Sequence, residues 1–460
     1  MMRIAVIGAG YVGLVTGTCL AELGNTVVCL DNDRVKIDRL RSGTAPFYEP
    51  QLLELILRNQ RAGRLSFSTD VAGGIRENAI IFIAVGTGMG AGGEADLSAV
   101  RAVATDIGRA LNGPKIVVSK STVPVETGDL IAALIAENAS ENHRVVVVSN
   151  PEFLREGSAV SDFMQPDRIV IGTDDAEAEA VLRYLYRSLG APIMVTDVRT
   201  SEMIKYAANA FLATKVSFMN EIANVCDLVG VDVEAVGRGM GLDRRIGTQF
   251  MHPGIGFGGS CLPKDLRALD RIAGSRGYDT TLLRAVESVN RRQIAATHAK
   301  IAAALGGAVG GSTVCVLGLA YKPNTDDLRE SPALALIERL LAAGAEVRAH
   351  DPAAIAAARG RFGDRITCHD SMYEAMRDAD ALVLATEWNE YKNLDFTLVR
   401  RMMRGDAFID GRNVFDPQAV AGAGLEYIGA GRRRAASAFS KVRQRGEQSV
   451  AQRDARLPIE

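Results

Sequence analysis

The sequence predicts an α/β protein in which two doubly wound Rossmann-like domains are joined by a central helical domain with one long helix. Three observations lead to this prediction. Short Val- and Ile-rich runs alternate with helix-periodic segments in the first and last parts of the chain. Glycine, with 46 of 460 residues, is enriched and concentrates at strand-to-helix turns. The middle of the chain has helical periodicity and no convincing strand.

The first domain is expected to span residues 1–198. Its apolar runs are continuous rather than alternating, which is typical of parallel strands buried on both faces. The predicted strands are 4–7, 27–30, 79–85, 116–119, 145–149 and 169–171.

The central domain is expected to span residues 199–305. Its pattern predicts one long helix over 201–229, ended by Gly230, and further helices over 263–273 and 282–305. The long helix has a broad apolar face. We therefore expect it to pack against something large, such as a second subunit, and the chain to form a homodimer through it.

A glycine-rich break at 306–311 precedes a second doubly wound domain, expected over 311–430. Its predicted elements are strands at 314–317, 346–350, 381–385 and 407–410 and a helix at 331–343.

The last segment, 431–460, has eight Arg or Lys, three Asp or Glu and few large apolar residues. This composition predicts a disordered, solvated tail. An electrostatic contact with an acidic partner is the alternative.

The composition argues against several classes of protein. The formal net charge of −2 gives no general attraction to nucleic acid or membrane. No apolar run approaches the ~18 residues of a membrane span. The N-terminus has no signal-peptide pattern, so a cytoplasmic protein is expected.

The cysteines and histidines lack the spacings of a disulfide framework or a metal site. Of six cysteines, four lie in apolar patterns that predict buried packing, and Cys261 is the exception. The five histidines are scattered, and we predict no metal site.

The start of the chain carries a dinucleotide-binding fingerprint. Gly8, Gly10 and Gly13 form a GxGxxG turn directly after the first strand, where a helix N-terminus favours a pyrophosphate. Asp31 ends the second strand 18 residues after Gly13, the place of a ribose-binding acid. Because a carboxylate there repels a 2′-phosphate, we expect NAD rather than NADP. Lys36 either reaches the cofactor phosphates or is a solvated surface lysine.

The second domain lacks this fingerprint. Its first turn reads Gly318-Leu-Ala-Tyr-Lys322, with Ala320 where the second glycine would stand. The turn therefore argues against a second dinucleotide and suits a different phosphate-bearing ligand gripped by Lys322.

The stretch from Phe257 to Asp265 is the candidate for covalent chemistry. Cys261 precedes Pro263, which suits the first turn of a helix, so the thiol is expected near a helix N-terminus with Lys264 close by. Both features lower the pKa of a thiol. Asp265 can face the thiol from the first helical turn. A buried or incidental cysteine is the alternative.

A second group of polar residues points to acid–base and oxyanion chemistry. Lys205 and Asn209 are four residues apart on the long helix, so they share one face and can stabilise a developing negative oxygen. The alternative is a surface Lys205 paired with Glu202.

Thr87, Thr122 and Glu152 follow strand ends, where open α/β sheets bind ligands. Glu152 is a candidate general base.

Together, these motifs resemble the nucleotide-sugar dehydrogenase family over about residues 2–430. The resemblance is carried by Gly8-Ala-Gly-Tyr-Val-Gly13, Ser121-Thr-Val-Pro, Asn150-Pro-Glu-Phe-Leu-Arg-Glu-Gly157, Lys205-Tyr-Ala-Ala-Asn209, Gly256-Phe-Gly-Gly-Ser-Cys261-Leu-Pro-Lys-Asp265, Gly318-Leu-Ala-Tyr-Lys322 and Asp410-Gly-Arg412.

The resemblance implies that two NAD oxidise the C6 alcohol of a nucleotide sugar to a carboxylate. Cys261 would form a thiohemiacetal and then a thioester, which water hydrolyses. Lys205 and Asn209 would stabilise oxyanions, Asp265 with Thr122 would position water and protons, and Glu152 would be the base in hydrolysis.

The resemblance also implies binding residues. Those for the cofactor are Gly8, Gly10, Val12, Gly13, Asp31, Lys36, Thr87, Thr122, Glu156, Lys264 and Arg329. Those for the substrate are Glu152, Phe153, Leu154, Arg155, Lys205, Asn209, Arg245, Phe257, Gly258, Lys322 and Arg412. Arg245 looks like the arginine that reaches into the partner subunit's site.

UDP-glucose is the expected sugar, because Glu156-Gly-Ser-Ala and the stretch 166–172 look more like that branch. GDP-mannose or UDP-N-acetylmannosamine remain alternatives with the same chemistry. A one-step hydroxyacid dehydrogenase would need neither Cys261 nor a second α/β domain. A non-catalytic nucleotide-binding sensor would not need the assembled Cys, Lys, Asn, Glu and Asp residues described above.

Overall fold

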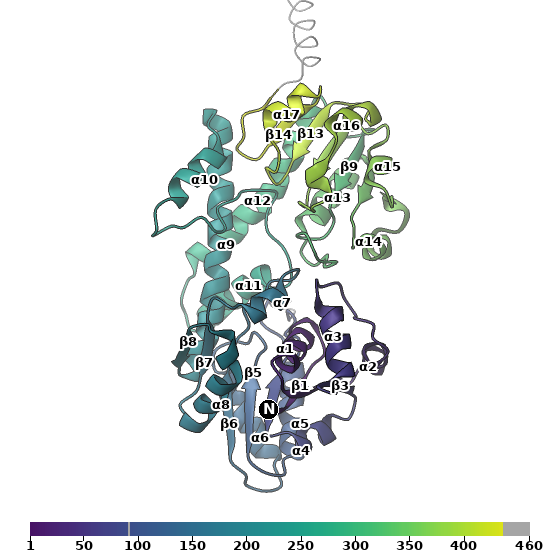
Figure 1. Cartoon of the computed structure of the whole chain (residues 1–460). Coiled ribbons are helices and arrows are strands. Elements are labelled where there is room, and N and C mark those ends of the chain that lie inside the picture. Colours follow the sequence, from purple (N-terminus) through teal and green to yellow (C-terminus); the bar gives the residue numbers. More distant parts are fainter. Residues whose placement is uncertain (91–92, 436–460) are drawn as a thin grey trace, which may run out of the picture. The chain divides into compact units, whose positions relative to one another are not determined.

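The computed structural model describes residues 1–90 and 93–435 and divides the chain into two compact units. The N-terminal unit comprises residues 1–210 and 264–280. The C-terminal unit comprises residues 211–263 and, within the described range, 281–435. Figure 1 labels most of the helices and many of the strands of both.

An eight-stranded sheet forms the centre of the N-terminal unit, in the order β3-β2-β1-β4-β5-β6-β7-β8. Its strands are β1 (Arg3–Ile7), β2 (Thr26–Leu30), β3 (Leu65–Ser68), β4 (Ile80–Ile83), β5 (Lys115–Ser119), β6 (Val145–Ser149), β7 (Ile169–Gly172) and β8 (Ile193–Thr196). Neighbouring strands are parallel except β6 and β7, so β7 and β8 run against the rest. The predicted doubly wound fold is confirmed.

The sheet differs from the prediction at its edges. The strands β3 and β8 were not predicted, because each lies at one end of the sheet and is only partly buried, without a continuous apolar run. The strand predicted at 79–85 is shorter, and ends at Ile83.

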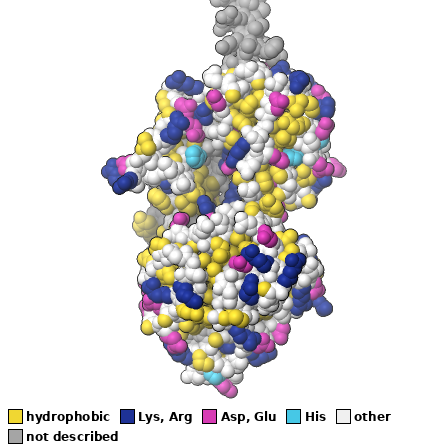
Figure 2. Space-filling view, viewed as in Figure 1, with side chains coloured by type: hydrophobic (Ala, Val, Ile, Leu, Met, Phe, Trp, Pro, Cys, Tyr) yellow, Lys and Arg dark blue, Asp and Glu magenta, His cyan; other side chains and the backbone are white. Residues whose placement is uncertain are grey.

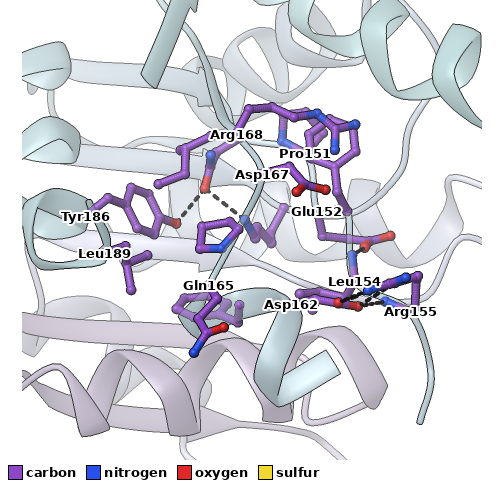
Figure 3. Close-up of a pocket in the computed structure, with 16 residues that line it drawn as sticks. Pro151, Glu152, Leu154, Arg155, Asp162, Gln165, Asp167, Arg168, Tyr186 and Leu189 are labelled. Atoms are coloured by element: carbon purple, nitrogen blue, oxygen red, sulfur yellow. Dashed lines mark hydrogen bonds and ion pairs between the residues drawn. The ribbon is translucent and has the colours of Figure 1, made fainter. Parts of the chain in front are cut away.

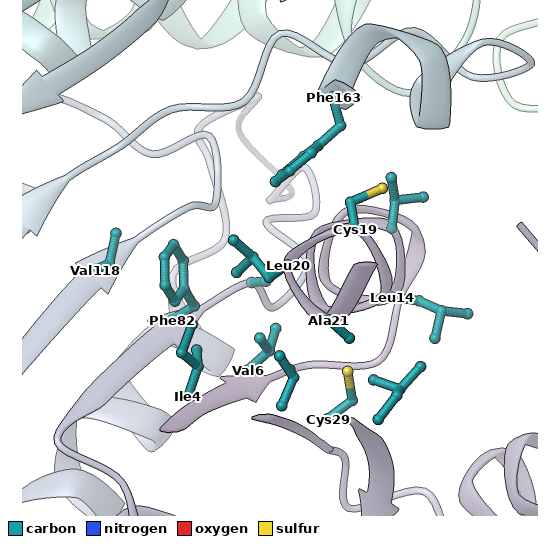
Figure 4. Packing of buried hydrophobic residues seen from close by; sticks show 14 of the residues in the cluster. Ile4, Val6, Leu14, Cys19, Leu20, Ala21, Cys29, Phe82, Val118 and Phe163 are labelled. Carbon is teal, nitrogen blue, oxygen red and sulfur yellow. The ribbon is translucent and has the colours of Figure 1, made fainter. Parts of the chain in front are cut away.

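Helices cover both faces of this sheet. They are α1 (Tyr11–Glu22), α2 (Arg34–Arg41), α3 (Leu52–Arg61), α4 (Val71–Glu77), α5 (Ser98–Arg109), α6 (Thr127–Asn138), α7 (Ala159–Met164) and α8 (Ala176–Tyr186). One apolar cluster packs α1, α2, α3, α7 and α8 on one face, and Figure 4 shows part of it around Leu20 and Phe82. A second cluster packs α4, α5 and α6 on the other. This double coverage explains the continuous Val/Ile runs.

Two glycines make the turn from β1 into α1 possible. Gly8 has a φ of +101°, which disfavours other residues. A Cβ on Gly13 would lie 1.8 Å from the carbonyl oxygen of Gly8, so a side chain there would force the helix away from the strand. Gly10, the N-cap of α1, has a φ of −79° and, among the described residues, no other atom within 4 Å of an added Cβ.

The C-terminal unit contains a six-stranded parallel sheet, in the order β11-β10-β9-β12-β13-β14. Its strands are β9 (Thr313–Leu317), β10 (Glu346–His350), β11 (Thr367–Cys368), β12 (Ala381–Leu384), β13 (Ala407–Asp410) and β14 (Glu426–Gly429). The four strands predicted here are confirmed within one residue. The short edge strands β11 and β14 were not predicted.

The remaining helices include the long one. They are α9 (Val198–Val229), α10 (Val233–Gly241), α11 (Leu262–Ser275), α12 (Thr281–Ala304), α13 (Pro332–Ala342), α14 (Ile355–Phe362), α15 (Met372–Met376), α16 (Phe396–Met402) and α17 (Pro417–Gly422). The long helix begins three residues earlier than predicted, and α10 was not predicted. Residues 199–210 and most of α11 group with the N-terminal sheet, while the rest of the helical middle groups with the C-terminal one. The predicted boundaries at 199 and 305 stay a prediction.

In the second Rossmann-like sheet, the aspartate after the second strand, Asp351, accepts hydrogen bonds from the turn that follows the first strand. Gly318 repeats the left-handed turn of Gly8, with a φ of +90°. Asp351, directly after β10, is 1% exposed and accepts hydrogen bonds from Leu319 N at 2.7 Å and Ala320 N at 3.0 Å. This carboxylate is used by the protein's own backbone, in agreement with the missing second fingerprint.

The first residues of the predicted tail are ordered. Ala435 pairs with Tyr427 of β14 in an isolated antiparallel bridge, and Arg432 forms an ion pair with Asp232 at 3.2 Å. The prediction of disorder is therefore wrong for 431–435, because these residues have partners on β14 and before α10. Residues 436–460 lie outside the described range.

The surface mixes charges. Figure 2 shows acidic and basic side chains interspersed over the visible face of each unit. In the described ranges, no helix is long and apolar enough to cross a membrane. Four cysteines are buried, as expected, and these are Cys19, Cys29, Cys226 and Cys315.

The two glycines Gly13 and Gly10 predict opposite effects on stability. Gly13→Ala inserts a methyl group against backbone, so we expect a loss of about 1–3 kcal/mol. For a unit of this size, that corresponds to a fall in Tm of several degrees, measured by calorimetry. Gly10→Ala, the matched control, should leave Tm unchanged or slightly raised. Equal Tm values for both variants would contradict the packing role of Gly13.

Candidate active site

The carboxyl ends of β1, β2, β4, β5 and β6 carry the predicted polar residues of the N-terminal unit. In a parallel sheet these ends lie along one edge, where ligands bind in open α/β folds. The α1 helix begins at this edge, and its N-cap Gly10 supplies no side-chain hydrogen bond. Its first backbone N–H groups are therefore available to an anion.

Asp31 lies at the end of β2 and faces the glycine turn. Its Oδ2 accepts hydrogen bonds from Ala9 N and Lys36 Nζ, both at 2.8 Å, and its Oδ1 accepts one from Asp33 N at 3.0 Å. Burial alone would raise the pKa of Asp31, but these hydrogen bonds and the charge of Lys36 lower it overall. Lys36 is therefore not a fully solvated surface lysine. It is the ion-pair partner of that carboxylate.

Thr87, Thr122 and Lys264 meet at the ends of β4 and β5. Thr87 Oγ1 donates to Thr122 O at 2.8 Å, and Lys264 Nζ donates to Thr87 Oγ1 at 3.3 Å. Lys264 Nζ also lies 2.8 Å from Asp265 Oδ1. The first turn of α11 is therefore joined to two strand ends.

Lys205 and Glu152 form a buried ion pair. Lys205 Nζ lies 3.0 Å from Glu152 Oε1, and the two residues are 4% exposed each. The alternative of a surface Lys205 paired with Glu202 is wrong. Glu202 instead accepts hydrogen bonds at 2.8 Å from the N–H groups of Glu126 and Gly128 at the start of α6, and burial raises its pKa to about 7.

Asn209 lies one turn further along α9. Its Nδ2 donates to Asp265 Oδ2 at 2.6 Å, and Asp265 is fully buried. The structure therefore joins the predicted residues Lys264, Asp265 and Asn209 in one polar network. Buried charges of this kind are costly to a fold, and their concentration at a strand edge is typical of an active site.

The segment after β6 lines a cavity of about 110 Å³ in the N-terminal unit. Figure 3 shows Glu152, Leu154 and Arg155 on its walls. The guanidinium of Arg168 lies 3.6 Å from the ring centroid of Phe153, and Arg155 pairs with Asp162 at 2.6 Å.

Glu49 is a buried carboxylate that sequence reasoning missed. It accepts hydrogen bonds from the hydroxyl of Tyr11, in the first turn of α1, and from Gly157 N at 2.6 Å and Ala159 N at 2.8 Å. Glu49 thus connects the cofactor-type turn to the segment that carries Glu156. The signal was an acid between aromatic and proline residues in Pro46-Phe-Tyr-Glu-Pro50.

The C-terminal unit holds Arg412 and Lys322, two of the predicted substrate-binding residues. Arg412 donates to the carbonyl oxygens of Ala385 at 2.7 Å, Gly256 at 3.2 Å and Tyr321 at 3.3 Å. It therefore ties the glycine loop to the turn that carries Lys322, whose Nζ lies 5.2 Å from the Tyr321 ring centroid.

Close backbone packing continues along the glycine loop. Gly259 N donates to Arg329 O at 2.9 Å, and a Cβ on Gly258 would lie 2.1 Å from Glu330 O. Phe257 N donates to Asn290 Oδ1 at 2.9 Å. Cys261 follows this loop, is partly exposed, and directly precedes α11, as predicted.

Two predicted arginines lie on the surface. Arg329 pairs with Asp327 at 2.8 Å and has a side chain 63% exposed. Arg245, in the segment after α10, pairs with Asp243 at 2.6 Å and is 89% exposed. In the described ranges, no group of three or more His, Cys, Asp or Glu could hold a metal ion.

Family models match most of the chain. The NAD binding domain of the UDP-glucose/GDP-mannose dehydrogenase family matches residues 2–190, its central domain residues 199–292 and its UDP binding domain residues 315–417.

Several relatives are similar over nearly their whole length. UDP-glucose 6-dehydrogenase of Pseudomonas aeruginosa is 50% identical over 446 residues, covering 94% of this chain and 98% of the relative. A UDP-glucose dehydrogenase structure from Pyrobaculum islandicum is 40% identical with a TM-score of 0.88, covering 94% and 98%. A UDP-D-ManNAc dehydrogenase structure from Pyrococcus horikoshii is 30% identical with a TM-score of 0.83, covering 94% and 99%. The chain therefore belongs to the UDP-glucose/GDP-mannose dehydrogenase family, as its motifs predicted.

Proposed function

We propose that this chain catalyses the NAD-dependent, four-electron oxidation of UDP-glucose to UDP-glucuronate. The observation that carries the proposal is the buried polar network of Lys205, Glu152, Asn209 and Asp265 at the strand ends of a dinucleotide-type sheet. The relative with 50% identity, named UDP-glucose 6-dehydrogenase, supports UDP-glucose as the sugar.

The cofactor is NAD, and the glycine turn fits it. The open space above Gly10 and the uncapped N-terminus of α1 suit a pyrophosphate. The carboxylate of Asp31 suits a ribose with two free hydroxyls and repels a 2′-phosphate. We also assign Thr87, Glu156 and Lys264 to this site. When bound, NAD accepts a hydride from the sugar C6 in each of the two oxidations.

Cys261 carries the covalent chemistry in this proposal. Its thiol adds to the C6 aldehyde to give a thiohemiacetal, and loss of a second hydride leaves a thioester. Water then cleaves the C–S bond, which releases the carboxylate and returns the thiol. Covalent capture retains the reactive aldehyde between the two oxidations.

The buried network supplies charge and proton transfer. The Lys205 ammonium and the Asn209 amide stabilise the negative oxygen that develops on C6. Asp265 and Thr122 position water and protons. Glu152, held by Lys205, takes a proton from the water that attacks the thioester.

The nucleotide part of the substrate is assigned to the backbone-rich region of the C-terminal unit. Lys322 supplies a positive charge to the diphosphate. Arg412 ties Gly256, directly before the loop from Phe257 to Cys261, to Tyr321 through their carbonyl oxygens. In the N-terminal unit, Phe153, Leu154 and Arg155 complete the assigned contacts.

We also propose a homodimer through α9 and a cytoplasmic location. Phe211, Phe218 and Val225 recur every seven residues on α9 and are 65%, 46% and 48% exposed. Three large apolar side chains along one helix face are typical of a helix–helix interface. Arg245, exposed after α10, is assigned to the partner subunit's site.

Counting NADH tests the chemistry. With limiting UDP-glucose and excess NAD, the wild type should make two NADH per sugar, measured by absorbance. Cys261→Ala should lose this turnover because no thioester forms, and Cys226→Ala, a buried cysteine outside the site, is the control. One NADH per sugar would contradict the thioester route. Two NADH from GDP-mannose or UDP-N-acetylmannosamine, with none from UDP-glucose, would correct the substrate.

Asp31 should decide the cofactor preference. Asp31→Asn removes the negative charge, so the ratio of kcat/KM for NAD over NADP should fall by about ten-fold or more. Lys36→Met, which keeps the carboxylate, should retain the preference for NAD. A preference that is unchanged in Asp31→Asn would argue against ribose recognition by this residue.

The apolar face of α9 should hold the dimer together. Phe218→Glu places a charge in the proposed interface, so light scattering should show a monomer where the wild type is a dimer. Tyr278→Glu, an exposed aromatic position outside α9, is the control and should stay dimeric. A dimeric Phe218→Glu variant would place the interface elsewhere.

A further inference from the structure

A buried lysine without a role in the proposed mechanism lines the same cavity as Glu152. This residue, Lys120, directly follows β5 and is 6% exposed. Its Nζ donates to Asn150 Oδ1 at 3.0 Å. Within the described residues, this oxygen is the single hydrogen-bond acceptor of the ammonium.

Asn150 connects Lys120 to the segment that carries Glu152. Its Oδ1 also accepts a hydrogen bond from the hydroxyl of Tyr186, on α8, at 2.6 Å, and its Nδ2 donates to Val170 O of β7 at 2.7 Å. In Figure 3 a dashed line marks the hydrogen bond of the Tyr186 hydroxyl. Asn150 is 1% exposed and lies two residues before Glu152, so these bonds hold the start of that segment.

Two buried lysines, Lys205 and Lys120, interact with the charge of Glu152. The carboxylate has an ion-pair partner in Lys205, which is also assigned to an oxyanion and so cannot serve Glu152 alone throughout the reaction. Lys120 is the second buried cation that acts on this carboxylate. Burial lowers the pKa of Lys120 to about 8, the charge of Glu152 opposes that fall, and Lys205 adds to it. The other charged groups on the cavity wall are Arg155, Asp162, Asp167 and Arg168.

We propose that Lys120 is a positioning residue for Glu152, which fixes its segment through Asn150 and supplies a second buried positive charge to this carboxylate while Lys205 serves the oxyanion. This inference rests on the proposed role of Glu152 as the base in thioester hydrolysis. A buried carboxylate loses contact with water, and a nearby positive charge offsets part of that loss.

The role is specific to one step. Hydride loss and addition of the Cys261 thiol do not need Glu152 as a base in the proposed mechanism, whereas hydrolysis does. Loss of the Lys120 charge should therefore slow hydrolysis and leave the thioester to accumulate. Rapid mixing of enzyme with excess UDP-glucose and NAD separates the steps, since two NADH per site appear before hydrolysis.

Two variants separate charge from hydrogen bonding. Lys120→Gln removes the charge and keeps a donor for Asn150. Tyr186→Phe removes a hydrogen bond to the same Asn150 oxygen and leaves the charge. In Lys120→Gln we expect a full burst of about two NADH per site and a steady-state rate lower by about ten-fold or more. In Tyr186→Phe we expect a full burst and a steady-state rate within about five-fold of the wild type.

The wild type supplies a measurement that needs no variant. Because the pKa of Lys120 is about 8, the ammonium loses its proton as the pH rises through that value. The hydrolysis rate should fall between about pH 7 and 9 while the burst amplitude stays constant. In Lys120→Gln this alkaline limb should be lost.

The outcomes distinguish the two proposals. A wild type that forms no NADH from UDP-glucose would overturn the proposed function. A wild type that forms two NADH per sugar, with a hydrolysis rate that does not fall up to pH 9, would overturn the role of Lys120 alone. So would a Lys120→Gln variant whose burst and steady state fall together, or whose pH profile keeps its shape. A thermal melt of each variant ensures that folded enzyme is compared.

Discussion

The parallel sheet of the N-terminal unit is buried on both faces, and the positions of the polar residues follow from that constraint. Apolar clusters from α1, α3, α7 and α8 on one side and from α4, α5 and α6 on the other cover the strands, and the two charged strand residues Arg3 and Lys115 stand at strand starts. Polar side chains can gather where the strands end. Because neighbouring parallel strands end at one edge, Asp31, Thr87, Thr122 and Glu152 follow their strands at that edge.

The buried ion pair of Lys205 and Glu152 is costly by itself, because both groups lose their water. The structure compensates with neighbours that are themselves fixed. Asn150 is held by Tyr186 and Val170, and Glu202 ties α9 to the first turn of α6. The helix that carries Lys205 and Asn209 is thereby fastened to the strand edge. Such a support is expected where a charged group must keep one geometry during a reaction.

The two Rossmann-like sheets show how one turn can serve two purposes. Both begin with a glycine at positive φ, and both have an aspartate after the second strand that accepts a hydrogen bond from the turn. In the first sheet Asp31 stays partly accessible, at 9% exposure, and is balanced by Lys36. In the second, Asp351 is 1% exposed and bound by two turn amides and Trp388. The second carboxylate is therefore occupied by the protein's own donors.

Continuous apolar runs, helical periodicity and glycine motifs are local properties, so the fold class, the central strands, the long helix and the family could be predicted from the amino-acid sequence alone. It also placed Cys261 before α11 and Lys205 with Asn209 on one helix face. The folded chain was needed to see that Lys205 pairs with Glu152 rather than Glu202, and that Lys36 pairs with Asp31. It likewise revealed Glu49, Lys120 and Asn150, and the edge strands β3, β8, β11 and β14. These depend on which segments distant in the chain lie side by side, and on which charges lose their water when they do, which no local pattern of residues encodes.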